Sequence, residues 1–402
     1  MRCNSSFFKI FGKNFLSTFW LLFSLFTWRQ ISLIILRNFS DHMQGYEMSF
    51  LSYAVYYLAS ASLTIISSYF KEKFNHKNYY LWIIVAIVSY ISLLFCSNLL
   101  PFAFLSGVSV GMGIPLCLAY FADNTYIENR GKSGALTFFI TSLSFPLLVW
   151  IQENYLFFGL IWIIIALLVI FLLKPKVAIE EVERKISFRT ILTNRQFILF
   201  FLSWSIFCFI DAFEAPILDN FLEKSFSSST INFLANIGTV VTAFAILLSG
   251  IVADYYGRKI VLTYGFVTLG LAYAIIGVAY QNVLSWLIFS VIDGAATGLF
   301  IVIFVFTIWG DLSQKGLREK YYAIGSLPFF LIFFIQKLLF PYVVKIPVSA
   351  AFSFASFFLF LAVIPLLYAP ETLPEKIIRR RELRKYVEKA KKIREKYEKE
   401  KD

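Results

Sequence analysis

The chain has 402 residues, of which 59% are hydrophobic and 15% are charged. A soluble globular domain is nearer half apolar and a quarter charged, so the composition excludes that class and predicts an all-helical integral membrane protein. The net charge of +12 does not indicate nucleic-acid binding, because the basic residues gather in the C-terminal tail and beside apolar runs. The four cysteines have no disulfide or metal-ligand spacing, so we expect no metal site and no cofactor.

Twelve apolar runs are long enough to span a membrane, since about 20 apolar residues cross the hydrocarbon core. Six precede a polar stretch and six follow it. The runs are 15–37, 50–69, 79–97, 100–122, 134–152, 155–173, 196–218, 231–252, 259–280, 283–309, 321–340 and 347–369. The sequence therefore predicts an N-terminal six-helix bundle over 1–173, a cytoplasmic linker over 174–195, a C-terminal six-helix bundle over 196–369 and a charged cytoplasmic tail helix over 370–402.

Lysine and arginine are distributed unevenly between the two sides of these runs. Nineteen of these residues lie at the N-terminus or in loops on the same side of the membrane as the N-terminus, without counting the C-terminal tail. The loops on the opposite side hold three, Arg37, Lys224 and Lys345. Positively charged loops face the cytoplasm. Both termini are therefore predicted to be cytoplasmic, in a multi-pass protein of the plasma membrane.

A short hairpin joins the eighth and ninth runs. Gly250–Lys259 reads G-I-V-A-D-Y-Y-G-R-K. Gly257 suits a turn with positive φ, Asp254 can face a helix N-terminus, and Arg258 can mark a cytoplasmic loop.

The hairpin has a counterpart in the first half of the chain. Ser68–Lys77 lies 182 residues earlier, where Glu72 aligns with Asp254 and Lys73 supplies the basic residue that Tyr255 replaces. Parallel repeats of this kind occur in secondary transporters.

Two further sequence signatures occur at the ends of apolar runs. One, an acid seven residues before an arginine, follows both the fourth and the tenth run, and the other follows the twelfth. Asp123 precedes Arg130 by seven residues, and Asp311 precedes Arg318 by the same number. The twelfth run is followed by P-E-T-L-P-E, which contains Glu371.

These motifs resemble those of the major facilitator superfamily, whose signature G-x-x-x-D-(R/K)-x-G-R-(R/K) lies between the second and third helices of each six-helix half. The acid seven residues before Arg-Gly and the P-E-T sequence resemble the sugar-porter branch. That branch's P-E-S-P-R signature after the sixth span is absent, since the chain reads K-P-K-V-A there. The resemblance implies two pseudo-symmetric six-helix bundles, a monomer, and transport by alternating access.

The resemblance also implies that the loop charges form a latch on the cytoplasmic side. Asp254 would face the fifth span and Glu72 the eleventh, and nearby arginines would pair with the other acids. The alternative is that these are ordinary charges of cytoplasmic loops. The predicted latch residues are Glu72, Lys73, Asp123, Arg130, Gly250, Asp254, Gly257, Arg258, Asp311, Arg318 and Glu371.

Ionisable residues inside a span are costly and mark function. In this superfamily the first, fourth, seventh and tenth spans line a central cavity, which implies substrate or coupling roles for Arg29, Asp211, Glu214 and Asp293. The alternative for Arg29, Glu214 and Lys337 is that they extend to the headgroup region. Asp293 is the deepest acid and could carry a coupling proton or pair with Lys337 or Arg29.

The substrate is only broadly constrained. Proton-coupled sugar porters carry an Asp in the first span and amides in the seventh, whereas this chain has Arg29 and no such amides. Arg29 could hold an anionic substrate or pair with Asp211. We expect a non-enzymatic transporter in the bilayer that moves a small polar organic solute, with protons as a candidate coupling ion. The alternatives are a non-transporting receptor or sensor on the same scaffold and an exporter of hydrophobic compounds. The sequence contains no nucleotide-binding loop of the G-x-x-x-x-G-K-(S/T) kind, which argues against a primary pump.

Overall fold

The structure is a computed structural model that describes residues 14–43, 46–73, 81–96, 98–150, 155–173, 187–314 and 316–375, with a few positions beyond them. Within these ranges the side chains of 39–49, 70–73, 94 and 145–158 are not described. Every regular element in the described ranges is a helix, and no strand occurs there.

Six long helices precede residue 174 and the remainder follow residue 187. The first set is α2 (Phe15–Met43), α3 (Tyr46–Lys73), α4 (Leu81–Phe95), α5 (Leu100–Asn124), the 3-10 turn η2 (Ile127–Asn129), α6 (Arg130–Trp150) and α7 (Tyr155–Leu173). The second set is α8 (Phe188–Leu192), α9 (Arg195–Ser225), α10 (Ser228–Tyr256), α11 (Arg258–Ala279), α12 (Val283–Phe300), η4 (Ile301–Ile308), α13 (Trp309–Leu312), α14 (Arg318–Val343) and α15 (Val348–Tyr368).

The helices have the length and composition of membrane spans. Nine within the described residues are long and apolar enough to cross a bilayer, and two shorter apolar helices lie within α4 and α7. The prediction of an all-helical membrane protein is thereby confirmed. The number of twelve spans, the bundle boundaries and the cytoplasmic location of the termini stay predictions.

Local sequence sets where several helices begin. Asn194, Ser227 and Asn282 each place a side-chain oxygen near a backbone N–H of the following turn, at the starts of α9, α10 and α12. Such caps satisfy donors that the helix itself leaves unpaired. The tenth apolar run, predicted as one helix, instead passes from α12 through the π-helical segment η4 into α13.

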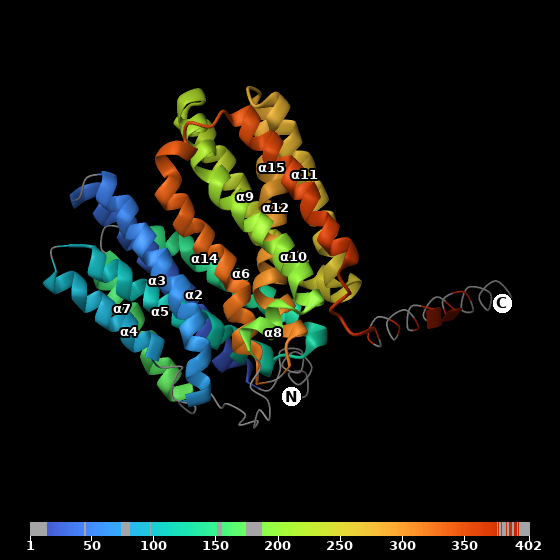
Figure 1. Cartoon of the computed structure of the whole chain (residues 1–402), viewed down its shortest axis with the longest axis horizontal. Coiled ribbons are helices and arrows are strands. Elements are labelled where there is room, and N and C mark those ends of the chain that lie inside the picture. Colours follow the sequence, from blue (N-terminus) through green and yellow to red (C-terminus); the bar gives the residue numbers. More distant parts are fainter. Residues whose placement is uncertain are drawn as a thin grey trace, which may run out of the picture.

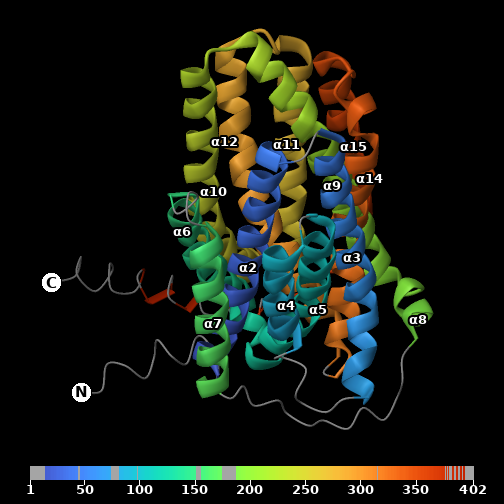
Figure 2. The same ribbon diagram turned by 90° about the vertical axis from the view of Figure 1, so that its left-hand side faces the viewer.

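The helices form two groups (Figure 1). One contains α2, α3, α4, α5 and α7, and the other contains α9 to α12 and α15, while α6 and α14 lie between them and contact both through α6–α10 and α14–α3. Figure 2 shows the first group in front, with helices of the second group behind it and extending further at one end. The functional question therefore concerns the interface between these groups.

Glycines allow α3 and α5 to pack backbone to backbone. A Cβ on Gly107 or Gly111 would meet the carbonyl oxygens of Tyr56 or Ser60 on α3 at less than contact distance. The approach lets the Ser60 hydroxyl donate to Gly107 O at 3.1 Å and the Thr64 hydroxyl donate to Gly111 O at 3.2 Å. Small residues four apart are a common means of close helix association in membranes.

The same packing recurs between α10 and α12, 187 residues later in the chain. A Cβ on Gly294 would lie 2.6 Å from Gly238 O, and one on Gly298 would lie 2.8 Å from Thr242 O. The internal repeat seen in the loop motifs therefore extends to the contacts between helices.

We predict that Gly111→Ala lowers the stability of the detergent-solubilised protein by about 1–3 kcal/mol, because the added methyl overpacks the α3–α5 contact. Alanine favours helices over glycine by about 1 kcal/mol, so a loss reports packing. Gly238→Ala is the control, since its Cβ would lie 3.6 Å from the nearest atom. Equal melting temperatures for the two variants would contradict this packing account.

Candidate functional site

Gly257 sets the turn between α10 and α11. Its φ of 106° lies in the region that favours glycine, so α10 ends at Tyr256 and α11 starts at once with Arg258. A Cβ at Gly257 would also meet the carboxylate of Glu371. That carboxylate accepts from the backbone N–H groups of Arg258 at 2.9 Å and Lys259 at 3.1 Å. Glu371 thus caps the N-terminus of α11.

Asp254 makes the corresponding contact with the N-terminus of α6. Its carboxylate accepts from the backbone N–H of Gly131 at 3.1 Å and of Lys132 at 2.8 Å, and the residue is fully buried. A Cβ on Gly250 would lie 2.5 Å from Gly131 O, so glycines let the helices approach closely enough for this contact. The positive end of a helix stabilises such a carboxylate.

Arg258 connects this contact to a second acid. Its Nη2 lies 3.1 Å from Asp254 Oδ1 and donates to Ile127 O at 2.7 Å, while its Nε lies 3.0 Å from Asp311 Oδ2. The side chains of Arg258, Asp254 and Asp311 are all 0% exposed. A buried guanidinium is tolerated because it has carboxylate and carbonyl partners.

The two acid–arginine motifs pair crosswise. Arg130 Nη1 forms a buried ion pair with Asp311, and Arg318 Nη1 lies 2.7 Å from Asp123 Oδ1. Each arginine therefore pairs with the acid of the other motif rather than with the acid seven residues before it. Thr372 adds a donor to Asp311 Oδ2 at 3.2 Å. We call this set of contacts the ion-pair network.

The structure brings together nine of the eleven predicted latch residues, with Gly250 and Gly257 providing the close approaches. The side chains of Glu72 and Lys73 lie outside the described residues. Tyr69, one turn earlier on α3, lies 5.2 Å beneath the ammonium group of Lys320 at the start of α14. The sequence did not point to Thr372 or to the crossed pairing, because the partners lie 61 to 195 residues apart.

The charged residues inside the helices differ from this network in having few partners. Arg29 on α2 lies 5.1 Å from the ring centre of Phe329 on α14. Glu214 on α9 accepts from the Tyr273 hydroxyl of α11 at 2.8 Å. Arg29, Asp211, Glu214 and Asp293 are all partly exposed, and none forms an ion pair with another described residue. Asp211 lies within electrostatic range of Arg29 from the opposite group.

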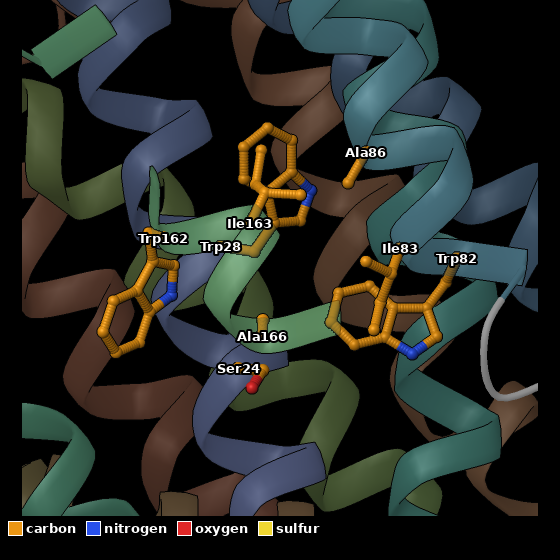
Figure 3. Close-up of a pocket in the computed structure, with 8 residues that line it drawn as sticks. All are labelled: Ser24, Trp28, Trp82, Ile83, Ala86, Trp162, Ile163 and Ala166. Atoms are coloured by element: carbon orange, nitrogen blue, oxygen red, sulfur yellow. The ribbon is translucent and has the colours of Figure 1, made fainter. Parts of the chain in front are cut away.

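A separate small pocket lies inside the first group, between α2, α4 and α7 (Figure 3). It is lined by Ser24, Trp28, Trp82, Ile83, Ala86, Trp162, Ile163 and Ala166. Within the described structure, the Ser24 hydroxyl and the indole nitrogens of Trp28 and Trp82 are buried and have no hydrogen-bond partner. The cavity has a volume of about 10 Å³, which is room for about one water molecule. It is too small for an organic solute.

The fold is that of known transporters. The structure superposes on the proton:xylose symporter XylE bound to 6-bromo-6-deoxy-D-glucose with a TM-score of 0.67 and 14% identity, covering 89% of this chain and 96% of that one. For the human organic anion transporter MFSD10 (TETRAN) the TM-score is 0.64 at 14% identity, with coverages of 88% and 98%. For a bacterial homologue of the iron transporter ferroportin in an outward-facing state it is 0.68 at 12% identity, with coverages of 88% and 97%.

Sequence comparison gives a family match as well. No curated protein matches the chain, but residues 212–397 match the family model described as Major Facilitator Superfamily. The matched region contains the hairpin with Asp254 and Gly257, Asp311, Arg318 and the P-E-T sequence. The C-terminal part of the chain, residues 212–397, is therefore similar to the Major Facilitator Superfamily, and the fold is shared with structures of transporters over most of the chain.

Proposed function

We propose that this protein is a secondary active transporter that moves a small polar organic solute across the plasma membrane by alternating access. The observation that carries the proposal is the contrast between two levels of the interface between the helix groups. At one end, Arg130 and Arg318 pair with acids from the other half of the chain. Halfway along the helices, Arg29, Asp211, Glu214 and Asp293 are partly exposed and form no ion pair with another residue that the structure describes. This is the arrangement expected of a transporter closed on one side and accessible at its centre.

The ion-pair network is suited to act as the latch. Asp254, Arg130 and Arg318 each contact a partner that lies on the other half of the chain. Separating the helices at this end must break these contacts together, and removing one partner of a buried ion pair costs about 3–5 kcal/mol. Two conformations of a protein differ by a few kcal/mol, so the network can decide between them.

The charges of the loops indicate which side of the membrane the closed end of the protein faces. The network lies at the end of the helices to which the positively charged loops belong, which is the cytoplasmic side under the positive-inside rule. In this proposal the structure is closed toward the cytoplasm. Two six-helix bundles over 1–173 and 196–369, joined by 174–195, would be the moving bodies of a monomer.

The nature of the solute follows from the polarity of the central residues. Arg29, Asp211, Glu214 and Asp293 are ionisable groups in a membrane interior, where such groups mark substrate and ion paths. The XylE symporter and the organic anion transporter have similar folds. A small polar organic solute, with the sugar-porter branch as the nearest in motif, is therefore the substrate class that we propose. Asp293 is the candidate proton carrier, since it is partly exposed and has no ion-pair partner in the described structure.

For the orientation, we predict that single cysteines at Ser228 and Lys345 react with an impermeant maleimide added outside intact cells, while one at Glu183 does not. Ser228 and Lys345 are exposed at the end opposite the network, and Glu183 belongs to the predicted cytoplasmic linker. Reaction at Glu183 from outside would contradict the six-plus-six topology.

For the latch, we predict that Asp254→Asn slows solute uptake into proteoliposomes with little loss of folded protein. The amide keeps an acceptor for α6 but loses the charge beside Arg258, which biases the protein away from the closed state by about tenfold. A Ser133→Cys reporter, buried near this contact in an otherwise cysteine-free protein, should be alkylated faster. Arg379→Gln, which removes an exposed pair with Glu375, is the control. Unchanged uptake and alkylation in Asp254→Asn would rule out the latch role.

For coupling, we predict that Asp293→Asn still exchanges solute across liposomes but loses uphill accumulation driven by a pH gradient. A neutral side chain mimics the protonated carrier and can no longer release a proton on the other side. If Asp293 were only a structural partner, the substitution would instead lower yield and melting temperature. Uphill uptake that survives with unchanged pH dependence would exclude the carrier role.

A further inference from the structure

Two pairs of helices join the halves of the chain at opposite edges of the molecule. On one edge α6 packs against α10, and on the other α3 packs against α14. Figure 2 places α6 and α10 on one side of the molecule and α3 and α14 on the other. Each pair combines a helix of the N-terminal half with one of the C-terminal half, so the two edges can be compared along their lengths.

One face of α10 changes from buried to exposed with distance from the ion-pair network. Residues three or four apart share a face of a helix, so the following residues form one row along α10: Asp254, Gly250, Ile246, Ala243, Thr239, Asn236 and Asn232. The first three are buried, the fourth is half-buried and the last three are exposed. A Cβ on Gly250 would lie 2.5 Å from Ala135 Cβ on α6. The row that packs on α6 near the network is therefore exposed further along.

The exposed part of this row differs in chemistry from the exposed face beside it. Thr239, Asn236 and Asn232 are polar, whereas the adjoining exposed face carries large apolar side chains such as Val240 and Phe244. Neither asparagine amide has a hydrogen-bond partner among the residues that the structure describes. Unpaired polar groups are costly against lipid tails. We therefore expect the polar row to face water and the apolar face to contact lipid.

The α3–α14 edge stays packed over its whole length. Next to the ion-pair network, Lys320 Nζ lies 5.2 Å from the ring centre of Tyr69. At the far end, the ring centres of Phe50 and Phe340 are 4.5 Å apart, and aromatic contact continues between the two ends. A helix rises about 29 Å from Phe50 to Tyr69. The two halves of the chain therefore separate on the α6–α10 edge but not on this one.

We propose that the two halves open and close by rotating about the α3–α14 edge, so that in this state water enters from the far end between α6 and α10. The proposal rests on the transport function argued above and specifies how its two states differ. A symmetric rocking motion would have to break the aromatic contacts at one end of α3 in each state. Rotation about a packed edge keeps those contacts and changes the α6–α10 edge, as in hinged closure of domains.

The register of the α6–α10 contact predicts which positions meet when the far end closes. A Cβ on Gly250 would also lie 2.5 Å from Gly131 O, at the start of α6. The two helices run antiparallel, since α6 begins at the network and α10 ends there. Ser142 lies about three turns further along α6, and Thr239 lies about three turns earlier on α10. Closure is therefore expected to bring Ser142 and Thr239 together.

The first measurement compares neighbouring cysteines at one depth on two faces of α10. Thr239→Cys and Val240→Cys, each in an otherwise cysteine-free full chain, are treated outside intact cells with an impermeant methanethiosulfonate that carries a trimethylammonium group. Both positions are exposed, so access alone does not separate them. The thiolate is the reacting form and apolar surroundings disfavour it, so Thr239→Cys should react about tenfold faster or more. Asn236→Cys should behave as Thr239→Cys does.

The second measurement asks whether one edge closes or both do. The pairs Ser142→Cys with Thr239→Cys and Phe50→Cys with Phe340→Cys are treated with a short bismaleimide, with and without Asp254→Asn. Because Asp254→Asn weakens the ion-pair network, it should raise cross-linking of the first pair by about tenfold and leave the second pair unchanged. Size-exclusion profiles and melting temperatures show whether each variant is folded.

Equal reaction rates of Thr239→Cys and Val240→Cys would overturn the proposal, because the polar row would then not differ from the lipid-facing side. Loss of the Phe50–Phe340 cross-link in Asp254→Asn would overturn it as well, because the α3–α14 edge would then open. Neither measurement involves a solute, so both concern the opening alone. Solute uptake by Asp254→Asn and Asp293→Asn tests the transport function independently.

Discussion

Asp311 connects the N-terminal and C-terminal halves of the chain through its ion pairs. Its carboxylate pairs with Arg130 at the start of α6 and with Arg258 at the start of α11, and it accepts from Thr372 after α15. All three charged side chains are fully buried. A carboxylate in this position is stable only while its cations remain in place. The ends of three helices, each at a different part of the chain, are therefore fixed relative to one another by one side chain.

The network has a consequence for motion, because its members are buried and shared. Asp254 and Arg258 pair with each other. Asp254 also accepts from the N-terminus of α6, and Arg258 also pairs with Asp311, so loss of one contact leaves a buried charge with fewer partners. Because the contacts share residues, we expect the set to break together when the helices separate. The central residues differ from this network, since Arg29 and Asp211 are partly exposed and neither forms an ion pair with another residue that the structure describes. Charges left without partners in a membrane interior are costly, and a bound solute would remove that cost.

Much of this organisation was predictable from the sequence, because it rests on local patterns. Apolar run length predicted the helices, and Gly257 and Asp254 are readable because a positive φ and a helix N-terminus each favour one kind of residue. The crossed pairs were not predictable, because Asp123 and Asp311 have the same spacing to their own arginines and only the packing of α5 against α14 decides which arginine each meets. The π-helical segment η4 was missed because its residues, I-V-I-F-V-F-T-I, also suit an ordinary helix. Gly107, Gly111, Gly294 and Gly298 acquire their role only from the helix that each one faces.

The central claim is that the ion-pair network closes one end of the protein while the other end is accessible, and that the two ends move reciprocally. Spin labels at Tyr126 and Gln314 report the network end, and labels at Asn98 and Gln281 report the opposite end, all at exposed positions. Distances between each pair, measured by double electron–electron resonance, should change in opposite directions in Asp311→Asn relative to the unsubstituted chain. The network-end distance should lengthen as the opposite-end distance shortens. Two unchanged distributions, or two that lengthen together, would contradict the account.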